Sequence, residues 1–137
     1  MDQDTYRKGL QLRREVLGDR HVDGAVDDDT PFDQPLQEFI CGFAWGELWS
    51  RPTLSRRDRS LVILAMFSMS PRRIEMRAHI IGALRNGATP EEIREVLLHT
   101  AVYFGFPAVI ESFRIAKATL AEVEVNPEFL KSGTKST

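Results

Sequence analysis

Four residues between positions 71 and 86 have the types and spacing that proton-transfer chemistry needs. Arg72, Glu75, His79 and Gly82 are spaced three, four and three residues apart, so on a helix they form one stripe. Glu75 and His79 at positions i and i+4 can hydrogen-bond, which would raise the pKa of the imidazole. Apolar residues flank this stripe on both sides, and a polar line in an apolar frame is typical of a small polar pocket. The alternative interpretation is a histidine with a purely structural hydrogen bond.

A second candidate group lies in the helix expected from about residue 34 to Trp49. Glu47 falls on an apolar face of that helix, where a carboxylate is either paired or has a raised pKa. The other residues of that face are Leu36, Phe39, Ile40 and Phe43, and the opposite side carries Cys41, Trp45, Leu48 and Trp49. Two apolar faces predict that the helix is covered twice, by its own core and by a subunit or a ligand. A structural ion pair of Glu47 with Arg51 or Arg59, and plain packing of the tryptophans, are the alternatives.

Arginine is concentrated in the middle of the chain. Residues 51–85 hold eight arginines against Asp58 and Glu75, and arginine binds carboxylates and phosphates through two parallel hydrogen bonds. The cluster therefore favours a small anionic ligand, with solvated helix faces as the alternative. A net charge of −2 and the lack of any recognition motif argue against nucleic acid. His99, one turn before Tyr103, is a weaker site candidate. It borders an apolar helix face made of Ile93, Val96, Leu97, Ala101 and Phe104.

No motif for a metal or a nucleotide cofactor is present in the sequence. The three histidines are well separated, and there is no glycine-rich dinucleotide loop, phosphate-binding loop or His-Glu-x-x-His pair. If the protein is an enzyme, we therefore expect chemistry without a cofactor and without a metal.

The elements that must position these residues all read as helices. No segment alternates with a period of two, so the sequence predicts an all-α fold, a single-domain bundle of about six helices over 1–125 with a flexible tail over 126–137. Caps, glycines and prolines predict the following order: a helix over 4–17, an irregular acidic segment over 19–30, a helix capped by Asp33 and running to Trp49, a helix through 61–69, one from Pro71 to Asn86, one from Pro90 to Phe104, and one from Pro107 to Val123.

Composition limits the class of protein further. With 137 residues, 42% of them hydrophobic and 28% charged, the chain is long enough for one globular domain. The single cysteine, Cys41, excludes a disulfide within the chain. The longest apolar run, 61–67, is far too short to span a bilayer, and residues 1–14 lack the apolar core of a signal peptide. We therefore expect a soluble cytoplasmic protein with no membrane partner.

Several blocks of the sequence closely resemble the carboxymuconolactone decarboxylase family, specifically its 4-carboxymuconolactone decarboxylase branch. The resemblance covers about residues 5–123, and the block around Trp45-Gly46-Glu47 is its most specific part. The matching blocks are 6–9, 13–18, 45–52, 54–61, 78–79, 82–87, 92–98 and 101–108.

This resemblance implies an all-helical fold shared with the alkylhydroperoxidase D-like proteins and a homo-oligomer, a trimer or a hexamer. The peroxidase relatives use a Cys-x-x-Cys pair followed by a histidine four residues after the second cysteine. Arg72 and Glu75 occupy those cysteine positions here, and His79 occupies the histidine position. A disulfide relay cannot operate without the thiols, so a peroxidase activity is not expected.

The resemblance also implies a cofactor-independent carboxy-lyase that converts 4-carboxymuconolactone to 3-oxoadipate enol-lactone in the degradation of aromatic compounds. Such an enzyme must hold a carboxylate, stabilise a dienolate and deliver one proton. We expect His79 to donate the proton with its pKa tuned by Glu75, and Arg51 and Arg72 to bind carboxylates. The remaining candidates are Glu47, as a further catalytic residue that shapes the pocket, and Trp45, Trp49 and His99, as substrate-binding residues.

Two other functions fit the sequence. One is an enzyme of the same superfamily that acts on another small acid or lactone, as a tailoring decarboxylase or a lyase. The other is a non-catalytic helical oligomer that binds an acidic metabolite. Buried arginines at a pocket would favour an enzyme, whereas a pocket filled by Met66, Phe67 and Met69 would favour the non-catalytic protein.

Overall fold

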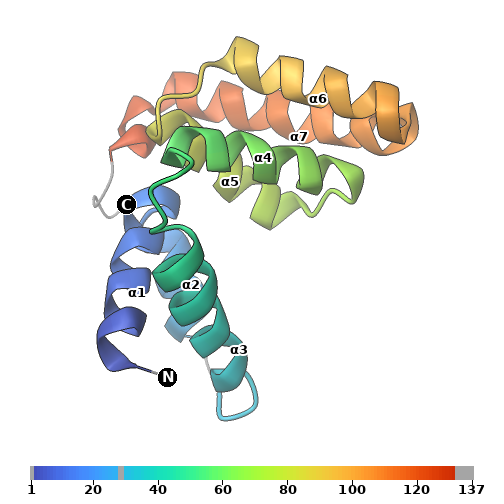
Figure 1. The fold of residues 1–137 in the computed structure, drawn as a ribbon. Helices are drawn as coiled ribbons and strands as arrows, with labels where there is room; N and C mark the ends of the chain where they lie inside the picture. Colours follow the sequence, from blue (N-terminus) through green and yellow to red (C-terminus); the bar gives the residue numbers. More distant parts are fainter. Residues whose placement is uncertain (1, 28–29, 132–137) are drawn as a thin grey trace. The chain divides into compact units, whose positions relative to one another are not determined.

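The computed structural model describes residues 2–27 and 30–131, and these ranges contain helices and no strand. The helices are α1 (Gln3–Leu17), α2 (Asp19–Asp27), α3 (Gln34–Glu38), a π-helix η1 (Phe39–Leu48), α4 (Arg56–Met69), α5 (Arg73–Arg85), α6 (Pro90–Phe104), α7 (Phe106–Val125) and a 3₁₀ turn η2 (Pro127–Leu130) (Figure 1). The predicted all-α class is confirmed. No helix in the described ranges is long and apolar enough to cross a membrane.

The helices group into two compact units, one up to Ser55 and one over Arg56–Lys131. In the first unit α1 packs along η1, α2 packs on α1, and α3 packs on η1. In the second unit α4 to α7 form a helical bundle, and η2 packs against α5 and α7. The expected division into a domain over 1–125 and a tail stays a prediction. The part of that tail before Ser132 includes η2, and the rest lies outside the described residues.

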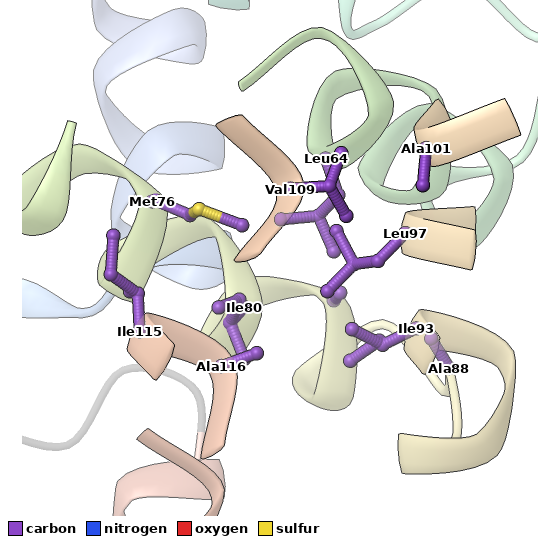
Figure 2. Packing of buried hydrophobic residues seen from close by; sticks show 11 residues of the cluster. Leu64, Met76, Ile80, Ala88, Ile93, Leu97, Ala101, Val109, Ile115 and Ala116 are labelled. Atoms are coloured by element: carbon purple, nitrogen blue, oxygen red, sulfur yellow. The ribbon is translucent and has the colours of Figure 1, made fainter. Parts of the chain in front are cut away.

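The core of the second unit draws on all four helices of the bundle (Figure 2). Its fully buried members include Leu64 on α4, Met76 and Ile80 on α5, and Ile93 and Leu97 on α6. The predicted apolar face of α6 is therefore confirmed through Ala101. It is wrong at Phe104, which is 55% exposed. Burial of these apolar side chains is the main force that holds the bundle together.

Most helix ends are where local sequence signals place them. Gly18, Gly87 and Gly105 all have positive φ angles, a conformation that glycine adopts without a steric penalty. At the start of α6 the Thr89 hydroxyl accepts a hydrogen bond from the Glu92 amide at 3.1 Å. The Glu92 carboxylate in turn accepts one from the Thr89 amide at 3.0 Å. This reciprocal capping box starts α6 at Pro90, where the sequence predicts that the helix begins.

Replacing Thr89 with alanine should lower the free energy of unfolding by about 1 kcal/mol, because the Glu92 amide loses its capping acceptor. Urea denaturation followed by circular dichroism measures this loss. Thr53→Ala is the matched control, since Thr53 is an exposed residue in the non-helical segment between η1 and α4. Equal stability of the two variants would show that the cap contributes nothing.

The acidic segment over 19–30 was expected to be irregular, and this prediction is wrong for residues 19–27, whereas residues 28 and 29 lie outside the described residues. Asp19–Asp27 forms helix α2, although few of its residues are apolar. Val22 is fully buried, and Arg14 on α1 pairs with Asp19 at 3.4 Å and Asp23 at 2.6 Å. Asp19 and Asp23 are one turn apart, so both carboxylates reach the same guanidinium. Contacts with α1 therefore hold α2 in place.

Two further helix starts differ from the predictions. Asp33 does not cap the next helix through its side chain. It has helical φ and ψ, and its carboxylate accepts a hydrogen bond from the Thr30 hydroxyl at 2.8 Å. Pro71 is not the first residue of α5, because Arg72 is still extended (φ −113°, ψ 112°) and the helix begins at Arg73. The single helix expected up to Trp49 is a short α-helix that continues as the π-helix η1.

Candidate functional site

His79 is the buried member of the predicted polar stripe. It lies in the middle of α5 with 8% of its surface exposed. Its imidazole ring faces the Phe67 ring of α4, with centroids 5.1 Å apart and planes tilted by 33°. Met76 and Ile80, on the same helix, point into the core of the bundle (Figure 2). An imidazole enclosed in this way is largely shielded from bulk water, which suits a group that transfers a proton to a bound substrate.

The other polar residues of the stripe lie toward the exposed start of α5. Glu75 is exposed one turn before His79, and Arg72 is exposed immediately before the helix. Gly82 is buried one turn after His79. The stripe thus runs from charged groups at the surface to an imidazole and a glycine in the interior. The structure keeps Arg72, Glu75 and His79 together in the second unit.

The tryptophans and Glu47 belong to the first unit. Trp45 and Trp49 are both buried, and their rings stack with centroids 4.4 Å apart and planes 22° from parallel. Between them in sequence, Glu47 is exposed and lines a hollow of about 430 Å³ at the start of α1. Arg51 is exposed just after η1. The core of this unit lies on the tryptophan side, while Leu48, expected on that side, is half exposed.

The backbone that carries the two tryptophans is a π-helix. The Trp49 amide donates to the Ala44 carbonyl at 2.9 Å, five residues back, where an α-helix would use the carbonyl four residues back. Segments of π-helix are rare and occur frequently at functional sites. The opposite face of this segment is exposed, with Leu36, Phe39 and Phe43 each more than half accessible. The two apolar faces predicted from the sequence are therefore present, and the unit's own core covers one of them.

His99 is placed differently from His79. It is exposed on α6, and its ring stacks against that of Tyr103 with centroids 5.1 Å apart. Tyr103 is itself 81% exposed. The pair belongs to the surface of α6, so His99 has a surface environment and His79 an interior one.

Two arginines of the central cluster hold helices together. Arg57 on α4 pairs with Glu92 on α6, and Arg77 on α5 pairs with Glu122 on α7 at 2.6 Å. The hydrogen bond from Arg77 lowers the pKa of the Glu122 carboxyl, against the opposing effect of desolvation. These two arginines therefore stabilise contacts between helices of the bundle. Fewer arginines of the cluster are then available to bind a substrate.

Sequence reasoning missed Arg13 as a separate candidate. Only 6% of its surface is exposed, and its Nη1 donates to Gln37 Oε1 at 3.0 Å and lies 3.6 Å from Cys41 Sγ. A signal was present in the sequence, because Arg13 lies one helical turn from both Gly9 and Leu17, on the buried face of α1. A charged residue on the buried face of a helix must be stabilised by a polar or charged partner, so it is a candidate for a binding role.

The described residues hold no group of three or more His, Cys, Asp and Glu side chains that could bind a metal ion. The second unit has a groove of about 730 Å³ between α6 and α7. Its floor is apolar and includes Ile93, Leu97 and Phe113, and its rims carry charged residues.

Comparison with known proteins identifies the group to which this arrangement belongs. The model of the carboxymuconolactone decarboxylase family matches residues 34–118, from α3 through most of α7. The chain belongs to the carboxymuconolactone decarboxylase family. It is 39% identical over 127 residues to the 4-carboxymuconolactone decarboxylase of Acinetobacter baylyi, an alignment that covers 93% of this chain and 95% of that protein.

Two other relatives are similar. A nitrosuccinic acid decarboxylase of Metarhizium robertsii is 39% identical over 124 residues, which are 90% of this chain and 87% of that protein. A 4-carboxymuconolactone decarboxylase sequence from Pseudomonas putida is 39% identical over 46 residues, which are 34% of this chain and 96% of that sequence. The family predicted from the sequence blocks is therefore confirmed, and the relatives of this family member are named as decarboxylases.

Proposed function

We propose that this chain is a cofactor-independent decarboxylase that converts 4-carboxymuconolactone to 3-oxoadipate enol-lactone. The observation that carries the proposal is the 39% identity to a 4-carboxymuconolactone decarboxylase over nearly the whole of both chains. The buried imidazole of His79 supports it, because decarboxylation ends with the delivery of one proton to carbon.

The substrate's own chemistry explains why no cofactor is needed. When the carbon–carboxylate bond breaks, CO₂ leaves and its bonding electrons spread through the alkene to the lactone carbonyl, giving a dienolate. The protein must hold the carboxylate that stays, stabilise the dienolate oxygen and return a proton to carbon. In this scheme His79 donates the proton, Glu75 tunes it, and Arg51 and Arg72 bind carboxylates. Glu47 is a further catalytic candidate, and Trp45, Trp49 and His99 are further substrate-binding candidates.

A second candidate substrate is nitrosuccinic acid, on the strength of the relative from Metarhizium robertsii at the same level of identity. Nitrosuccinic acid also carries two carboxylates, of which one leaves and one stays. Its nitro group can accept the electrons that the lactone carbonyl accepts in the first reaction. The two reactions therefore share one demand on the protein, a cation that holds the retained carboxylate.

A direct comparison of the two substrates tests this proposal. Purified protein is incubated with 4-carboxymuconolactone or with nitrosuccinate, and CO₂ release is followed for each. Faster release from the lactone supports the proposed activity, and faster release from nitrosuccinate supports the second candidate. Release from neither would contradict both, and would favour another acid or a non-catalytic role.

We also propose that the protein works in the cytoplasm as a homo-oligomer, a trimer or a hexamer. The free, buried Cys41 is compatible with a reducing compartment. Exposed apolar side chains support self-association, because monomers rarely leave large apolar patches uncovered. Several lie near the turn between α6 and α7, namely Val102, Tyr103, Phe104, Phe106 and Ile110.

The charges of the α6–α7 groove favour pairing with a second copy. Glu91, Arg94 and Glu124 lie at the end of the groove remote from Gly105, which is net acidic, and Arg114 and Lys117 lie nearer to Gly105. A two-fold axis across the groove would bring the acidic end of one copy onto the basic part of the other, and a hexamer with two-fold axes contains such pairs.

Charge reversal should therefore show compensation. Lys117→Glu and Glu124→Lys should each shift light-scattering mass toward smaller species, whereas the double variant should regain the wild-type mass. High salt should weaken the wild-type assembly in the same way. Single variants that keep the wild-type mass would exclude this groove as the contact between copies.

A further inference from the structure

Arg13 is a buried cation without a carboxylate partner among the described residues. Its Nη1 reaches only neutral groups, Gln37 Oε1 at 3.0 Å and the Cys41 thiol sulfur at 3.6 Å. Its Nε is buried and has no hydrogen-bond acceptor within the ranges that the structure describes. No ion pair within those ranges involves Arg13 either.

The next residue in the chain shows what a structural arginine of this unit looks like. Arg14 is about one-third exposed and pairs with Asp19 and Asp23. The hydrogen bond to Asp23 raises the pKa of the Arg14 guanidinium above its ordinary value. Arg14 therefore pairs with two carboxylates although water already solvates part of its charge. The more deeply buried Arg13 pairs with none among the described residues.

A guanidinium does not lose its proton in a protein, so Arg13 stays charged. Removing a charge from water is costly unless an anion compensates for it, and buried charges in proteins are normally paired. Gln37 fixes the orientation of the guanidinium but does not neutralise it. A carboxylate is the anion that matches the flat fork of an arginine with two parallel hydrogen bonds.

We infer that Arg13 binds the carboxylate that the substrate keeps after CO₂ has left. The inference rests on the proposed function, because both candidate substrates keep one carboxylate. It makes Arg13 a substrate-binding residue, with Gln37 as the group that positions it. The compensating anion would then be present only when substrate is bound.

The test uses the full-length protein and succinate as an unreactive dicarboxylate probe, with sodium chloride at the same ionic strength as the reference. Wild-type protein should melt at a higher temperature in succinate than in chloride. Arg13→Lys keeps the positive charge but loses the planar guanidinium that makes two parallel hydrogen bonds. The rise in melting temperature caused by succinate should therefore be smaller in this variant. The KM for the substrate that is turned over should rise at least about tenfold, with a smaller change in kcat. Arg14→Met, the matched control, should melt at a lower temperature but keep its succinate shift.

A second variant separates binding from structure. Arg13→Met combined with Gln37→Leu removes both polar partners, which is close to neutral for stability when the charge has no anion in the free protein. This double variant should melt no lower than wild type and show no succinate shift. A fall of several degrees together with a retained shift would show that Arg13 is a structural cation, and would overturn the inference.

Failure of the proposed function gives a different pattern. In one outcome, succinate raises the melting temperature of the wild type but not of Arg13→Lys, and neither substrate is turned over. Arg13 would then be an anion-binding residue, and the decarboxylase proposal would be wrong. Turnover of the lactone with no succinate shift in the wild type, and an unchanged KM in Arg13→Lys, would overturn the Arg13 inference alone.

Discussion

Replacing His79 with alanine should reduce the turnover of 4-carboxymuconolactone by about 10²- to 10⁴-fold, the usual contribution of a positioned acid or base. The reason is that the dienolate left by CO₂ loss must take up a proton, and His79 is the buried titratable group of the stripe on α5. The measurement is kcat from CO₂ release for the wild type and the variant at several pH values.

Rescue distinguishes a chemical role of His79 from a structural one. The imidazole packs against Phe67, so alanine leaves a space that free imidazole can enter. Added imidazole should restore part of kcat, because it supplies a proton donor in the place of the missing side chain. A purely structural role of His79 would require only that the space beside Phe67 is filled. Glu75→Gln should lower kcat less than His79→Ala does and leave the fold intact, since Glu75 is exposed. Wild-type kcat in His79→Ala would exclude His79 as the proton donor.

Replacing Gly9 with alanine should lower the free energy of unfolding by about 3 kcal/mol or more, the upper part of the range for overpacking. Gly9 lies where α1 crosses η1, and a Cβ added there would overlap the Cys41 carbonyl oxygen. It would also lie 2.6 Å from the Gly46 amide nitrogen. These atoms are backbone, so relief requires the two helices to move apart rather than one side chain to turn.

Gly24→Ala provides the matched control, because it adds the same methyl group to the same unit. Gly24 is within α2, and a Cβ there would meet no atom within 4 Å. Alanine should therefore stabilise the protein by about 0.5–1 kcal/mol, the ordinary difference between glycine and alanine in a helix. Urea denaturation of both variants gives the two changes. Equal effects at the two positions would contradict the close approach of α1 and η1.

The sequence predicted most of the fold because the relevant signals are local. Gly18, Gly87, Gly105 and the Thr89–Glu92 capping box each act within one or two helical turns, and each ends or starts a helix where expected. The stripe that contains His79 could also be identified in advance, since residues three and four apart on a helix share a face whatever surrounds them.

Tertiary structure decided what depends on contacts between distant segments. Helix α2 was missed because it is short and mostly polar, and because its stability depends on contacts with α1. Val22 is buried, and Asp19 and Asp23 pair with Arg14 of α1. The π-helical winding of η1 was missed because the apolar faces of this segment were predicted for an α-helix, in which successive residues are 100° apart.

The most important feature that the sequence could not predict is which arginine charges are already neutralised by a carboxylate. The sequence shows fourteen arginines but does not show which of them are already paired with a carboxylate, because charge pairing depends on distances between helices. The structure pairs Arg57 and Arg77 with glutamates across the bundle. It buries Arg13 beside a neutral amide and a thiol. Residue types and local spacing thus determined the family and the polar stripe, whereas only three-dimensional packing determined that Arg57 and Arg77 are paired across the bundle and that Arg13 is buried beside neutral groups.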